Sequence, residues 1–93
     1  MAVIFHIPSP LREFTVAQSY VQIAIEPTTL ADALSALWTL YPGLRDRVVT
    51  EQGEIREHIN IFIGDDDFRF TGGLASRISS GAEISIVPAI SGG

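Results

Sequence analysis

Hydrophobic residues recur with two different periods along the chain, and these periods predict strands on either side of one helix. Val3 to Ile7 is a β-rich run that Pro8 and Pro10 end, because proline cannot donate to a strand ladder. After a loop over Leu11 to Gln18, the segment Tyr20 to Ile25 alternates in polarity, with three apolar residues on one face: Val21, Ile23 and Ile25. These two runs predict an opening pair of strands.

The helix has the clearest pattern in the chain. Apolar residues follow one another at helical spacing: Leu30, Ala33, Leu34, Leu37, Trp38 and Tyr41. We expect a helix from about Thr29 to Tyr41 with its apolar stripe facing the core. Thr29 is a suitable N-cap with Asp32 as a capping-box-like partner, and Pro42-Gly43 is a stop signal. The segment Leu44 to Val49 is compatible with one more helical turn.

The second half of the chain predicts three further strands. Ile55 to Ile63 alternates in polarity, with Phe62 on one face and three isoleucines on the other: Ile59, Ile61 and Ile63. A polar turn over Gly64 to Asp67 leads to a short strand at Phe68 to Phe70, and Glu83 to Val87 reads as the last strand. The order β-β-α-β-β-β predicts an α+β domain, with one main helix packed on one face of a mixed sheet.

Composition and charge exclude several classes of function. The chain has 93 residues, of which 46% are hydrophobic and 18% charged, as expected for one small globular domain. Its net charge of −5 has the wrong sign for a nucleic-acid partner. No uncharged run exceeds 12 residues, whereas a membrane span needs about 18 or more. Since the first ten residues also lack the pattern of a signal peptide, we expect a cytoplasmic protein with no membrane partner.

Missing residue types exclude several chemistries. The chain has no Cys, and all six basic residues are Arg, so a thiolate nucleophile, a cysteine zinc site, a Walker lysine and a Schiff-base lysine are excluded. His6 and His58 are too few for a catalytic zinc site unless carboxylates complete it, and we expect ordinary packing or surface roles for them. Asp65, Asp66 and Asp67 lack the alternating spacing of a calcium loop and predict a solvated turn. We therefore expect no metal, no bound cofactor and no catalytic residue.

The chain ends in Gly92-Gly93. Two residues without side chains form a thread that can enter a narrow channel and present a carboxylate. A frayed end or an arbitrary chain boundary explains the dipeptide equally well when it is taken alone. We expect a folded domain over residues 1–90, followed by a mobile tail from Ser91 to Gly93.

Several segments resemble the MoaD/ThiS family of ubiquitin-like sulfur carriers: Tyr41 to Arg45, Ile59 to Ile63, Asp66 to Phe70 and Gly81 to Gly93. Within this family, Phe70 to Ala75 and Ile86 to Gly93 are most similar to the CysO-type carriers, which supply sulfur for cysteine synthesis. Gly64 departs from the family, where many relatives have Asn in this turn. The resemblance covers essentially the whole chain and implies a β-grasp fold.

The resemblance also implies a mechanism. An activating enzyme would use ATP to adenylate the Gly93 carboxylate, and a sulfur donor would then displace AMP to leave a thiocarboxylate. The chain would be a co-substrate rather than an enzyme. Cysteine synthase would accept the sulfur, or the chain would instead be the small subunit of molybdopterin synthase, with the large subunit as its partner. An alternative of another class is a ubiquitin-like protein modifier or a β-grasp binding module.

Apolar side chains near the tail are candidates for docking the activating enzyme: Phe62, Phe70, Val87 and Ile90. The reason is that Pro88 to Ile90 lead directly from the last strand into the tail. The alternative is that Phe62 and Phe70 are core residues under the helix.

Overall fold

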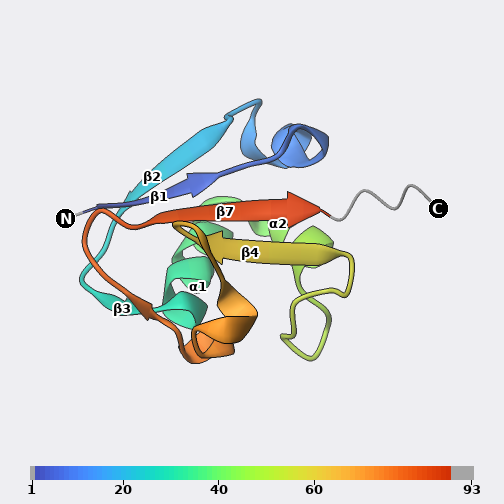
Figure 1. Ribbon diagram of the computed structural model, residues 1–93. Coiled ribbons are helices and arrows are strands. Elements are labelled where there is room, and N and C mark those ends of the chain that lie inside the picture. Colours follow the sequence, from blue (N-terminus) through green and yellow to red (C-terminus); the bar gives the residue numbers. More distant parts are fainter. Residues whose placement is uncertain (1, 89–93) are drawn as a thin grey trace.

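A five-stranded mixed sheet forms the centre of the computed structural model, which describes residues 2–88 (Figure 1). Its order is β2-β1-β7-β4-β5, and the strands are β1 (Ala2–His6), β2 (Tyr20–Ala24), β4 (Ile59–Ile63), β5 (Asp66–Asp67) and β7 (Glu83–Pro88). β1 and β7 run parallel, and the other neighbours run antiparallel. The first and last strands of the chain therefore lie side by side in the middle of the sheet, which confirms the predicted mixed topology.

Two helices cover one face of this sheet (Figure 1). α1 (Leu30–Leu40) begins as predicted, because the Thr29 hydroxyl accepts a hydrogen bond of 3.3 Å from the Asp32 amide. The Asp32 carboxylate accepts a hydrogen bond of 2.7 Å from the Thr28 hydroxyl. Pro42 ends α1 and starts α2 (Pro42–Val48) at once, so the predicted extra turn is a second short helix. Within residues 2–88, no helix is both long and apolar enough to span a bilayer.

The core lies between the helices and the inner face of the sheet. The alternation of each main strand turns its apolar side chains toward α1 and α2. Buried residues of the strands include Val3, Phe5, Val21, Ile23, Ile59, Ile61, Ile84 and Ile86, and those of the helices include Leu30, Ala33, Leu34, Leu37, Leu44 and Val48. Trp38 and Tyr41 pack against this core from its edge and are partly exposed.

The loop expected between the first two strands is instead a 3₁₀ helix, η1 (Ser9–Thr15). Two of its own residues, Leu11 and Thr15, are buried. The Thr15 hydroxyl donates to the carbonyl of Gln18 at 2.9 Å, which satisfies a polar group that burial would otherwise leave unpaired. A short polar segment without periodicity gave no signal for this element.

Two further expectations about the second half were wrong. β4 begins at Ile59 rather than Ile55, because Ile55 instead forms an isolated bridge with Val49. Phe68–Phe70 is a 3₁₀ helix, η2, and not a strand, because the Asp67 carboxylate accepts from the Arg69 amide and turns the chain out of the sheet. The strand that pairs with β4 on the side away from β7 is therefore β5, which precedes η2.

A second, two-stranded sheet lies apart from the main one and was not predicted. It joins β3 (Thr28–Thr29) to β6 (Arg77–Ile78), and η3 (Gly73–Ala75) precedes β6. Strands of two residues are too short for a period-two pattern to be recognisable.

Candidate functional site

The end of β7 fixes the point at which the C-terminal segment leaves the sheet. Pro88 is the last residue of β7 and pairs with Ile59, the first residue of β4. The exit therefore lies at one end of the sheet, in a central strand with β4 on one side and the end of β1 on the other. Ile90 and the tail Ser91 to Gly93 lie outside the described residues, so their expected roles and the mobility of the tail stay predictions.

Val87 and Phe62 lie on the outer face of the sheet, opposite the helices. Val87 is 40% exposed and Phe62 is half-buried. Because Phe62 pairs with Ser85 and Val87 pairs with Asn60, the two apolar side chains are diagonal neighbours across adjacent strands. The interpretation of Phe62 as a core residue under the helix is therefore wrong, since Ile61 and Ile86 occupy the inner face.

Phe70 is also not a core residue, because its side chain is 85% exposed at the end of η2. In a strand, Phe68 and Phe70 would share one face, whereas three residues per 3₁₀ turn place them on different faces. Phe68 takes the buried position at 8% exposure. Three of the four proposed docking residues are thus accessible in the described chain, and the fourth, Ile90, lies outside it.

The acidic turn is only partly solvated. Asp65 and Asp66 are exposed as expected, but the Asp67 side chain is only 14% exposed. The Arg69 guanidinium donates two hydrogen bonds to this carboxylate, and the Asn60 amide donates a third. These donors hold the pKa of Asp67 well below its usual range. Among residues 2–88, no three His, Cys, Asp or Glu side chains gather where they could hold a metal ion.

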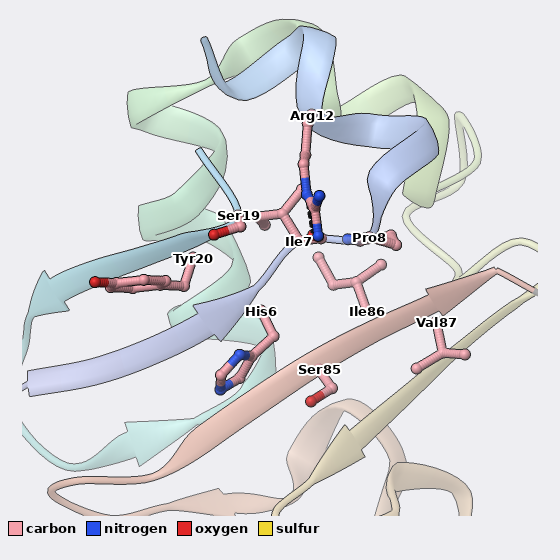
Figure 2. A pocket seen from close by; sticks show the side chains of 9 residues that line it. All are labelled: His6, Ile7, Pro8, Arg12, Ser19, Tyr20, Ser85, Ile86 and Val87. Carbon is pink, nitrogen blue, oxygen red and sulfur yellow. Dashed lines mark hydrogen bonds between the residues drawn. The ribbon is translucent and has the colours of Figure 1, made fainter. Parts of the chain in front are cut away.

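A pocket of about 350 Å³ opens beside the exit of β7 (Figure 2). η1 places Arg12 over it, and the Arg12 Nε donates to the Ile7 carbonyl at 3.1 Å. The other lining side chains come from the ends of β1, β2 and β7 and include His6, Ser19, Tyr20, Ser85, Ile86 and Val87. Sequence reasoning did not single out Arg12, because only the parallel pairing of β1 with β7 brings it near the end of β7.

The two histidines have the ordinary surface roles expected of them. His6 on β1 forms a hydrogen bond of 2.7 Å with the Glu83 carboxylate of β7, and both side chains are largely exposed. His58 is exposed immediately before β4. It lies in a second shallow pocket with Asp46, Arg47 and Arg56.

Comparison with known proteins identifies the family. The sequence model of the ThiS family matches residues 5–93. The chain belongs to the ThiS family. The sulfur carrier protein CysO of Mycobacterium tuberculosis (strain ATCC 25618 / H37Rv) is 36% identical over 95 residues, which cover all of both chains. This ThiS-family chain is thus a full-length homologue of a sulfur carrier protein, as the sequence motifs predicted.

Solved structures confirm the β-grasp fold of this ThiS-family member. A chain in the crystal structure of the BexX/CysO complex of Amycolatopsis orientalis superimposes with a TM-score of 0.89 and 30% identity, covering 99% of this chain and 100% of that one. The small archaeal modifier SAMP1 of Haloferax volcanii superimposes with a TM-score of 0.84 and 26% identity over all of both chains. The fold is therefore shared by proteins named as sulfur carriers and as modifiers.

Proposed function

We propose that this chain is a sulfur carrier for cysteine biosynthesis and that its Gly93 carboxylate carries the sulfur as a thiocarboxylate. The observation that carries this proposal is the similarity to CysO over the full length of both chains. The family match extends to residue 93, so it includes the Gly92-Gly93 end on which the chemistry depends. The chain would act as a co-substrate, and ATP would be bound by its activating enzyme.

The proposed chemistry has two steps. A carboxylate oxygen of Gly93 attacks the α-phosphate of ATP, which releases pyrophosphate and leaves a mixed anhydride with AMP. A donor at the oxidation level of sulfide then attacks the Gly93 carbonyl carbon and expels AMP, so that one oxygen is replaced by sulfur. No Cys thiol or Lys amine is present in the chain to intercept the anhydride.

The accessible apolar residues on the outer face support a docking role. Val87 lies one residue from the end of β7, and Phe62 is its diagonal neighbour. We propose that Phe62, Phe70, Val87 and Ile90 contact the activating enzyme while the tail enters its ATP site. Partly exposed apolar side chains beside a reactive segment are typical of such a contact.

Two alternative functions would use the same C-terminal end but differ in the partner that reacts with it. In a molybdopterin synthase, the same thiocarboxylate would pass its sulfur to a pterin precursor held by the large subunit. A protein modifier would instead form an amide between Gly93 and a lysine of a target. The second alternative has a specific observation in its favour, because small archaeal modifier protein 1 of Haloferax volcanii is 34% identical over 65 residues, 70% of this chain.

The direct test incubates the chain with its activating enzyme, ATP and sulfide, and measures intact masses. We expect a product in which one oxygen is exchanged for sulfur, and no such product from a chain that lacks Gly93. The absence of the product, or equal yields from both chains, would contradict the carrier proposal. The purified thiocarboxylate is then offered to cysteine synthase with an activated serine, to molybdopterin synthase with its precursor, and to lysine-containing proteins. Cysteine formation is the expected outcome.

A further inference from the structure

Arg12 is a half-buried cation without an anionic partner among residues 2–88. The ion pairs of this part of the chain join His6 to Glu83, Arg45 to Asp46 and Arg69 to Asp67. Arg12 uses its Nε to bond the Ile7 carbonyl, which fixes the plane of the guanidinium and leaves the two terminal amino groups for another acceptor. A guanidinium held in this way is suited to a carboxylate, which it can bind through two parallel hydrogen bonds.

The surroundings of Arg12 form a pocket that can take a side chain. Ile7 and Ile86, each 2% exposed, provide apolar lining, and the pocket has a volume of about 350 Å³. Three hydroxyl-bearing residues also line it: Ser19, Tyr20 and Ser85. Figure 2 shows the Arg12 side chain descending from η1 toward Ile7, near Ile86. The pocket thus combines one cation with an apolar lining, as a site for an aspartate or glutamate side chain requires.

The parallel pairing of β1 and β7 determines where this pocket lies. His6 pairs with Ser85, so the chain that continues from β1 into η1 departs beside the last residues of β7. β7 extends beyond this pair to Pro88, and Val87 lines the pocket. A partner that contacts the end of β7 therefore lies within reach of Arg12.

We infer that the Arg12 pocket binds an acidic side chain of the activating enzyme and so orients the tail for adenylation, an inference that rests on the proposed function. The chain has a net charge of −5, and most of its surface would repel an acidic group. Arg12, in a pocket beside the end of β7, therefore marks a position at which such a group can be accepted, and charge complementarity of this kind fixes the register of an interface.

The main test compares Arg12→Gln with Arg77→Gln. Arg77 is exposed on β6 in the separate small sheet and belongs to no ion pair of the described chain, so its replacement removes the same charge away from the pocket. We expect Arg12→Gln to raise the Kd for the activating enzyme about 10- to 100-fold, and Arg77→Gln to change it less than about twofold. Equal effects of the two variants would overturn the inference.

Ser19→Glu is a second variant that does not remove the Arg12 hydrogen bond to Ile7. Ser19 is exposed and lines the pocket, so a glutamate there offers Arg12 an internal carboxylate. We expect it to weaken binding of the enzyme as Arg12→Gln does, at an unchanged melting temperature. Normal binding by a folded Ser19→Glu would contradict the inference. So would normal thiocarboxylation by Arg12→Gln with slower sulfur transfer to the synthase, because the pocket would then serve the acceptor.

A titration with sodium acetate tests the pocket without any enzyme. At constant ionic strength set by chloride, the Arg12 Nε–H resonance should shift saturably, while that of Arg77 should not. A linear response equal to that of Arg77 would overturn the pocket as a carboxylate site. This measurement also separates the two proposals. A wild-type chain that binds acetate but is never thiocarboxylated would contradict the proposed function and leave the Arg12 pocket standing as a carboxylate site, whereas a chain that is thiocarboxylated but does not bind acetate would contradict the pocket alone.

Discussion

The carboxylate of Asp67 accepts a hydrogen bond of 2.9 Å from the side-chain amide of Asn60. This contact joins β5 to β4, and the side-chain Oδ1 of Asn60 also accepts from the Ile61 backbone amide at 2.8 Å. Asp67 pairs directly with Phe62, so the hydrogen-bonded group lies beside a proposed docking residue. An aspartate that looked like part of a solvated turn therefore stabilises the edge of the outer face.

The first prediction concerns the pH dependence of this contact. The pKa of Asp67 is lower in the folded chain than in the unfolded one, so the ionised carboxylate stabilises the fold at neutral pH. This stabilising contribution is fully present above about pH 4, which is the pKa of an aspartate in the unfolded chain. It declines as the pH falls from there toward the lower pKa of Asp67 in the folded chain. Asp67→Asn should therefore be less stable than wild type in urea unfolding at about pH 7, and the difference should shrink at about pH 3.

The control for this prediction is Asp65→Asn, which removes the same charge at an exposed position of the turn. The free energy of unfolding of Asp65→Asn should differ little from that of wild type at both pH values. If the difference in free energy of unfolding between wild type and Asp67→Asn stays constant with pH, the ionised form of Asp67 does not contribute to stability.

A second prediction tests the packing of α1. Leu37 is fully buried between the helix and the sheet, and Leu37→Ala should lower the free energy of unfolding by about 2 to 5 kcal/mol. Leu40 lies one turn later in the same helix but is 55% exposed, so Leu40→Ala should cost less than about 1 kcal/mol. Denaturant titrations of both variants measure the difference. Similar losses would contradict the assignment of the buried face.

The third prediction addresses the outer face. Val87→Glu should weaken binding of the activating enzyme about tenfold or more, because it places a charge in an apolar contact. Gln22→Glu, on the exposed face of β2, makes the same change in net charge farther from the exit of β7 and should leave binding within about twofold. Calorimetric titration measures both dissociation constants. If Val87→Glu binds normally, Val87 does not belong to the docking surface.

The fourth prediction concerns the reactive end. Gly92→Ala adds a Cβ next to Gly93, and a channel fitted to glycine has no room for it. Thiocarboxylation should fall about 10- to 100-fold, as expected for a small misplacement of a reacting group. The melting temperature should not change, because residue 92 follows the last strand. Intact-mass measurement of initial rates provides the test, and a rate equal to wild type would argue against a narrow channel.

Regular elements with a long enough pattern could be predicted from the sequence. α1 follows from six apolar residues at helical spacing and from Thr29 as N-cap, because a helix buries one stripe whatever it packs against. β2, β4 and β7 follow from alternation, and four of the inward residues predicted for β2 and β4 are buried: Val21, Ile23, Ile59 and Ile61. The family motifs added the β-grasp fold and the prediction that the Gly92-Gly93 end is the reactive group.

Short elements depended on individual side-chain hydrogen bonds and not on a repeated pattern. Phe68 to Phe70 alternates like a strand, yet hydrogen bonds to the Asp67 carboxylate make it a 3₁₀ turn, with Phe70 exposed. The same contacts removed Asp67 from solvent, which composition alone could not indicate. In such segments a single side-chain hydrogen bond outweighs a weak period-two pattern.

The sequence by itself determined the secondary structure of the main elements, the family and the residue types available for chemistry. Only the tertiary structure decided which residues surround the exit of the tail. Arg12 and Val87 are far apart in the chain, and they line one pocket because β1 pairs in parallel with β7. Local propensity carries no information about such a pairing, since its stability comes from burying both strands in one shared core.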